Sequence, residues 1–134
     1  MRTGRRDKLG PQGERIAARY LRRRGFRVLG RNLVTPFGEA DLLCTSPDGH
    51  IVVVEVKSRR AGNRGGPPPE ASVTRGKRQR LERVLAHLVR ANGWQQRPRR
   101  IDVVAVTFTR RGLLRSRASV RHFENAVGQG GGVR

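Results

Sequence analysis

Three carboxylates lie where a folded chain rarely places charge. Only 10 of the 134 residues are acidic, yet Asp41, Glu55 and Asp102 fall inside or beside apolar runs, namely Ala40–Leu43, Val52–Val56 and Ile101–Val104. A buried carboxylate requires a cationic partner, hydrogen bonds or a metal ion. Because acidic residues are scarce here, we expect these positions to carry either chemistry or deliberate ion pairing.

The turn between the first two apolar runs sets two of these carboxylates against each other. Pro47–Gly49 suits a three-residue hairpin loop with its glycine in the left-handed region. That loop pairs Ser46 with His50, and counting back from this pair places Asp41 opposite Glu55. Directly opposed residues have Cβ atoms about 4.5–5.5 Å apart, where like charges repel.

The same count places Glu39 opposite Lys57 and turns all four side chains to one face. A cation between Asp41 and Glu55 would relieve their repulsion. Hard divalent ions such as Mg²⁺ take carboxylate and carbonyl oxygens, so the backbone carbonyl of Val56 is a third candidate ligand. The alternative is a structural network of ion pairs, Glu39 with Lys57 and Asp41 with an arginine. The spacing alone leaves both interpretations open.

Lys57 follows Glu55 by two residues and is one of only three lysines among 30 basic residues. Lysine shifts its pKa when it is buried, whereas arginine stays charged. An amine at this position could hold an attacking water or a phosphate oxygen. We take the choice of lysine as modest evidence for chemistry at this face.

The formal net charge of +20 calls for a polyanionic partner, and nucleic acid is the commonest one. A genome biased toward arginine is the alternative explanation. Lys77, which follows an expected helix N-cap at Thr74, is placed to reach a phosphate. Together with it we expect nucleic-acid contacts from three arginines, namely Arg31, Arg59 and Arg78. A membrane partner is not expected, because aromatic residues are scarce and the longest apolar run is four residues.

The pattern of apolar residues predicts a single α/β domain with a central mixed sheet flanked by helices. Expected helices span Gly13–Arg24 and Thr74 to about Gly93; expected extended segments are 26–29, 31–34, 39–45, 51–58, 101–108 and 119–123. We expect a flexible basic arm over 1–10, the domain over 11–125 with a mobile loop at 59–72, and a disordered tail over 126–134. A lone cysteine and the lack of an apolar leader favour a cytoplasmic protein.

The motifs Gly38–Leu43 and Val54–Arg59 resemble the core of the PD-(D/E)xK nucleases. The wider pattern is similar to the YraN family of small bacterial proteins over about residues 10–123. The supporting motifs are Gly13-Glu14, Ala17, Tyr20-Leu21, Gly25-Phe26, Arg31–Leu33, Val73, Lys77, Leu81 and Arg100–Val104. Ala40 departs from the bulkier residue common at its position, which affects packing more than chemistry.

This resemblance implies a restriction-endonuclease-like fold, similar to that of Holliday-junction resolvases. It implies that Asp41 and Glu55 bind Mg²⁺ or Mn²⁺, that Lys57 is the catalytic lysine, and that Glu14 on the first helix assists the metal. The implied activity is hydrolysis of DNA, including branched repair or recombination intermediates, with a homodimer as a possible assembly. The alternative is a non-catalytic nucleic-acid-binding protein that retains the nuclease fold.

Overall fold

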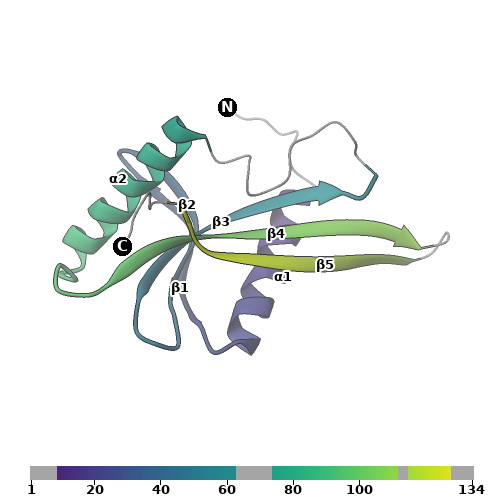
Figure 1. Cartoon of the computed structure of the whole chain (residues 1–134), viewed down its shortest axis with the longest axis horizontal. Coiled ribbons are helices and arrows are strands. Elements are labelled where there is room, and N and C mark those ends of the chain that lie inside the picture. Colours follow the sequence, from purple (N-terminus) through teal and green to yellow (C-terminus); the bar gives the residue numbers. More distant parts are fainter. Residues whose placement is uncertain (1–8, 63–73, 112–114, 128–134) are drawn as a thin grey trace.

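The computed structural model describes residues 9–62, 74–111 and 115–127, which form one five-stranded sheet and two helices (Figure 1). The elements in chain order are α1 (Leu9–Arg23), β1 (Arg27–Thr35), β2 (Gly38–Thr45), β3 (Ile51–Arg60), α2 (Arg75–Ala91), β4 (Arg99–Arg111) and β5 (Arg115–Val127). Residues 1–8 of the expected arm, 63–72 of the expected loop and 128–134 of the expected tail lie outside the described residues. Residues 126 and 127, which the sequence pattern assigns to the tail, are the end of β5.

The strands lie in the order in which they occur along the chain. β3 and β4 pair in parallel through the connection that contains α2, and every other neighbouring pair is antiparallel. The sheet is therefore mixed, as the sequence predicts. β4 and β5 form a long antiparallel pair, here called the arm, which runs away from α2 (Figure 1). β3 pairs with β4 as far as Phe108, so only the tip of the arm is two-stranded.

Alternating residues of the central strands supply two separate apolar cores. Ile51 and Val53 of β3 pack on the side of α2, against its apolar stripe of Leu81, Val84, Leu85, Leu88 and Val89. Val52 and Val54 pack on the other side, against Ala17, Ala18 and Leu21 of α1. Because strand side chains alternate between faces, the two helices cover opposite faces of one sheet. The chain is thus a single α/β domain, consistent with a nuclease-like fold.

The β2–β3 hairpin has the loop that the sequence predicts. The backbone N–H of Ser46 donates to the carbonyl of His50 at 2.9 Å, and Gly49 has a φ of 92°, in the left-handed region. The ladder then pairs Thr45 with Ile51 and continues to Leu42 with Val54. This register agrees with the counting as far as Leu42 with Val54, one pair short of Asp41 with Glu55.

Several elements are longer than the patterns predict. β4 and β5 extend well past the apolar runs, because strand pairing continues along the arm. β3 continues through Arg59 and Arg60, which the sequence pattern assigns to the following loop. α1 begins at Leu9, so the last two residues of the expected arm are helical. Neither helix within the described residues is long and apolar enough to cross a membrane.

The first helix approaches the sheet closely at a glycine. A Cβ placed on Gly13 would overlap the hydroxyl of Ser58 on β3 and lie 3.1 Å from the Ser58 Cβ. Glu14 follows Gly13 directly, so this close approach places Glu14 beside the strand that carries Glu55. Gly13 is therefore required by packing rather than by a special backbone conformation.

We predict that Gly13→Ala lowers the free energy of unfolding by about 1–3 kcal/mol, because the added methyl group overpacks the contact with Ser58. The matched control is Gly76→Ala in α2, where an added Cβ meets nothing within 4 Å. That substitution should be neutral or stabilising by up to about 1 kcal/mol. Urea denaturation of both variants measures the difference, and equal effects would contradict the close contact.

Candidate active site

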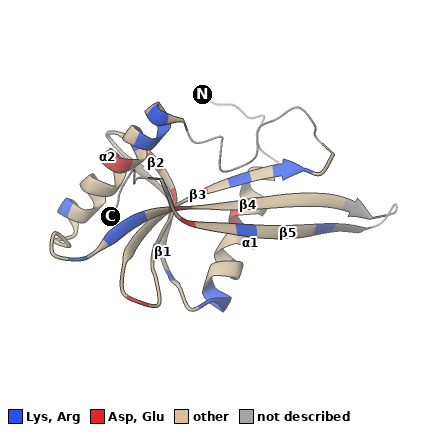
Figure 2. Ribbon diagram, in the orientation of Figure 1, with Lys and Arg blue, Asp and Glu red and all other residues tan. Residues whose placement is uncertain are grey.

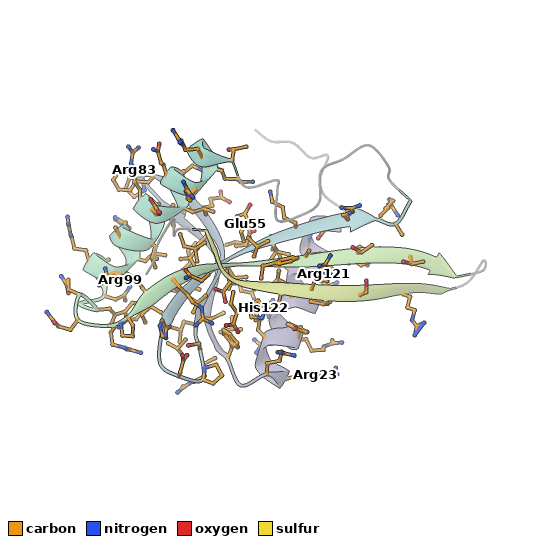
Figure 3. All side chains as sticks on the ribbon, in the orientation of Figure 1. Arg23, Glu55, Arg83, Arg99, Arg121 and His122 are labelled. Atoms are coloured by element: carbon orange, nitrogen blue, oxygen red, sulfur yellow. The ribbon has the colours of Figure 1, made fainter. Side chains whose placement is uncertain are left out.

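Glu55 is a buried carboxylate on one face of the sheet, and two lysines contact it. It follows four fully buried residues of β3 and is itself only 9% exposed. One of its oxygens, Oε2, lies 3.2 Å from Nζ of Lys57 and 3.0 Å from Nζ of Lys77. Lys57 is on the same face of β3, two residues along, and Lys77 comes from the first turn of α2. Figure 3 places Glu55 between β3 and the helix that covers this face.

Asp41 lies where β2 and β3 separate. The last pair of their ladder is Leu42 with Val54, and the next residue of β2 replaces strand pairing with a side-chain contact. The carboxylate Oδ2 of Asp41 accepts the backbone N–H of Val56 at 2.8 Å. A backbone group that would otherwise lose its partner is thereby satisfied. The side chain is consequently fixed beside Glu55.

The surroundings of Asp41 disfavour its negative charge. Burial, followed by the nearby carboxylate of Glu55, raises its pKa from 3.8 to about 7. The hydrogen bond from Val56 opposes this shift, the charge of Glu14 adds to it, and Lys57 counteracts it. Three carboxylates and one ammonium group therefore act on one another here, with like-charge repulsion and burial outweighing attraction.

The two lysines compete for the single Glu55 oxygen. Burial and the neighbouring Lys77 lower the pKa of Lys57. Burial also acts to lower the pKa of Lys77, but contact with Lys57 and attraction to Glu55 outweigh it and raise that pKa. Lys57 is accordingly the amine that gives up its proton more readily, and Lys77 is the one that stays charged.

The structure thus brings Glu14, Asp41, Glu55, Val56 and Lys57 to one place. Glu14 is half-buried in the first turns of α1, and its charge acts on Asp41. Even so, no group of three or more His, Cys, Asp or Glu side chains among residues 9–62, 74–111 and 115–127 is arranged so that it could hold a metal ion. Both lysine ammonium groups lie against the same Glu55 oxygen, Oε2.

The remaining predicted site residues are the four basic residues expected to contact nucleic acid. Lys77 was expected to contact a phosphate, and the structure places it on Glu55 instead. Arg59 and Arg78 are half-buried near the site, on β3 and α2, whereas Arg31 is exposed on β1 opposite Leu42. Figure 2 shows basic residues at the start of α2 and along the outer part of β3. Their contacts with nucleic acid stay predictions.

The expected pairing of Glu39 with Lys57 is wrong. β2 and β3 have separated by that point, and Glu39 instead pairs with Val34 of β1 and is exposed. No ion pair involving Glu39 occurs within the described part of the chain. The partner of Lys57 is Glu55, its neighbour on the same strand.

Asp102, the third carboxylate in an apolar run, has a structural role. It is fully buried and accepts hydrogen bonds from Arg100 (2.9 and 3.3 Å) and the backbone N–H of Asn125 (2.8 Å), and its Oδ2 lies 2.9 Å from Nε2 of His122. Desolvation raises its pKa, but these partners outweigh desolvation and lower it. Ion pairing is one of the two roles that its position in an apolar run predicts. The contact with His122 has no sequence signal, because only the strand pairing that sets His122 opposite Val104 reveals it.

We predict that Asp41→Asn stabilises the metal-free protein at neutral and higher pH. The pKa of Asp41 is higher in the folded state than in the unfolded state. The contribution of Asp41 to the free energy of unfolding is therefore most favourable below about pH 4 and is lost as the pH rises to about 7. The variant should exceed the wild type by roughly 1–3 kcal/mol at pH 8 and match it near pH 4. Denaturation in the presence of a chelator measures this, and a gain that is independent of pH would contradict it.

Comparison with known proteins identifies the family. The model of the uncharacterised protein family UPF0102 matches residues 13–106, which include every residue of the cluster. A UPF0102 protein from Roseiflexus castenholzii is 41% identical over 93% of this chain and 97% of its own length. UPF0102 proteins from Anaeromyxobacter sp. and Beutenbergia cavernae are 43% and 44% identical, each over 82% of this chain and over 80% and 91% of their own lengths. The chain therefore belongs to the uncharacterised protein family UPF0102, the YraN family whose motifs its sequence resembles.

Proposed function

We propose that this protein is a metal-dependent nuclease that hydrolyses phosphodiester bonds in DNA, including branched repair or recombination intermediates. The observation that carries the proposal is the enforced proximity of Asp41 and Glu55, with an amine of lowered pKa alongside. A purely structural ion pair would not place a second carboxylate where burial and the charge of Glu55 raise its pKa to about 7. A divalent cation between the two would make both charges favourable.

The donor set suits Mg²⁺ or Mn²⁺, which bind carboxylate and carbonyl oxygens. Asp41, Glu55 and the carbonyl of Val56 would hold the ion, with Glu14 assisting. The chemistry that such an ion supplies is polarisation of the scissile phosphate and a lowered pKa for the attacking water. Both lysines contact Oε2 of Glu55, so an ion bound through that oxygen would displace a lysine ammonium group.

Lys57 would then act on the reacting groups. Its Nζ lies 3.2 Å from Glu55 and its pKa is lowered, so it can accept a hydrogen bond in its neutral form and donate one in its charged form. Such an amine would orient the attacking water and stabilise charge that develops on the phosphate. Lys77, once released from Glu55, would meet a phosphate oxygen of the substrate.

The net charge of +20 supports a polyanionic substrate. Arg31, Arg59 and Arg78 would contact phosphates, which position a nucleic acid without reading its sequence. A specific observation favours a second candidate function, a non-catalytic nucleic-acid-binding module. Two lysines already neutralise Glu55, which is the arrangement that a site without metal would retain.

Cleavage assays test the proposal. Wild-type protein with Mg²⁺ or Mn²⁺ should cut at least one of four DNA forms, namely junction, flap, single strand or duplex, and a chelator should abolish cutting. Glu55→Gln, Asp41→Asn and Lys57→Ala should each reduce the rate by about 100-fold or more. The matched control is Glu82→Gln, which removes an exposed acid of α2 and should keep the wild-type rate. Absence of cleavage on all four forms, or equal rates in Lys57→Ala and wild type, would overturn the nuclease.

A further inference from the structure

A hollow of about 280 Å³ lies between α1 and the arm formed by β4 and β5. The residues that line it are Gln12, Arg15, Ile16, Arg19, Phe108, Arg117 and Ala118. Its volume is close to the lower end of the roughly 300–1,000 Å³ range of ligand pockets. None of these lining residues is acidic, and the site that contains Glu55 does not include any of them. We call this hollow the arginine groove.

The three arginines of the groove are a concentration of unbalanced charge. Arg15 and Arg19 are one helical turn apart on α1, where like charges destabilise a helix by about 0.2–0.5 kcal/mol. Arg117 faces the same hollow from β5. All three are exposed, and within the described residues none of them forms an ion pair. An anion bound in the groove would turn this repulsion into attraction.

The floor of the groove is apolar and includes an aromatic ring. Phe108 and Ala118 are paired across β4 and β5, and Ile16 of α1 completes the floor. Phe108 is half-buried, so part of its ring remains accessible. A ligand that matches both the arginines and the apolar floor has a negatively charged backbone beside a flat ring. Single-stranded nucleic acid has this combination, because its unpaired bases stack on aromatic rings while arginines hold its phosphates.

The groove lies on the face of the sheet that α1 covers, whereas Glu55 and Lys57 lie on the face that α2 covers. Gln12 and Arg15 flank Gly13, which contacts Ser58 on this same face, and Phe108 pairs with Arg60 at the end of β3. The groove is therefore a surface separate from the candidate active site. We propose that the arginine groove binds a single-stranded segment of the nucleic-acid partner, with its phosphates on Arg15, Arg19 and Arg117 and a base against Phe108. The inference rests on the nucleic-acid part of the proposed function and does not need cleavage.

Binding of a labelled single-stranded oligonucleotide in the presence of a chelator tests this. The groove variant is Arg15→Gln/Arg19→Gln/Arg117→Gln. The control is Arg27→Gln/Arg83→Gln/Arg90→Gln, which removes three exposed arginines elsewhere and leaves the same net charge. The groove variant should bind roughly tenfold or more weakly than the control, and its dependence of log affinity on log salt should be shallower by about 2. Equal losses in both variants would overturn the proposal.

Phe108→Leu tests the base contact separately. It should weaken binding of the single strand about fivefold or more and leave binding of an abasic strand of the same length unchanged. Equal weakening on both probes, or tighter binding of duplex than of single strand by the wild type, would overturn the assignment of a single strand. Loss of binding to anionic lipid vesicles in the groove variant, with oligonucleotide binding intact, would assign the groove to a membrane instead. These binding assays contain a chelator and do not depend on cleavage. Their results therefore stand even if the protein does not cleave DNA.

Discussion

The candidate site depends on the hydrogen bond that the backbone N–H of Val56 donates to the Asp41 carboxylate. It forms at the point where β2 and β3 stop pairing, so a side chain replaces the next rung of the ladder. This contact fixes one carboxylate beside the buried Glu55, where burial and the Glu55 charge raise the pKa of Asp41 to about 7. The separation of β2 from β3 is therefore what brings the Asp41 carboxylate beside that of Glu55.

The rest of the fold holds this feature in place from both faces of the sheet. On one face, α2 begins at the Thr74 N-cap, whose hydroxyl accepts the N–H of Lys77, and this positions the Lys77 ammonium on Glu55. On the other face, the close approach of Gly13 to Ser58 places Glu14 near Asp41. The buried network of Asp102 and His122 lies on the face that α1 covers, and its members satisfy one another's hydrogen bonds.

The sequence could predict those parts of the site that local rules determine. The hairpin loop fixes the register by a simple count, and strand alternation puts Glu55 and Lys57 on one face. The error at Glu39 arose because counting assumes that strands stay paired, and no local signal marks where they separate. The contacts of Lys77 and His122 required tertiary structure, because each joins elements whose relative placement the sequence patterns do not define. The arginine groove was missed for the same reason, since α1 and the arm are about 90 residues apart in the sequence.

Calorimetric titration of Mn²⁺ into the metal-free protein tests most directly the claim that the crowded carboxylates form a metal site. We expect a binding isotherm for the wild type that is lost in Asp41→Asn. Lys77→Met should bind Mn²⁺ more tightly, because it removes the ammonium group that competes for Oε2 of Glu55. Glu82→Gln, which changes an exposed acid outside the cluster, should bind as the wild type does. Absence of heat in the wild type, or an unchanged isotherm in Asp41→Asn, would contradict the account.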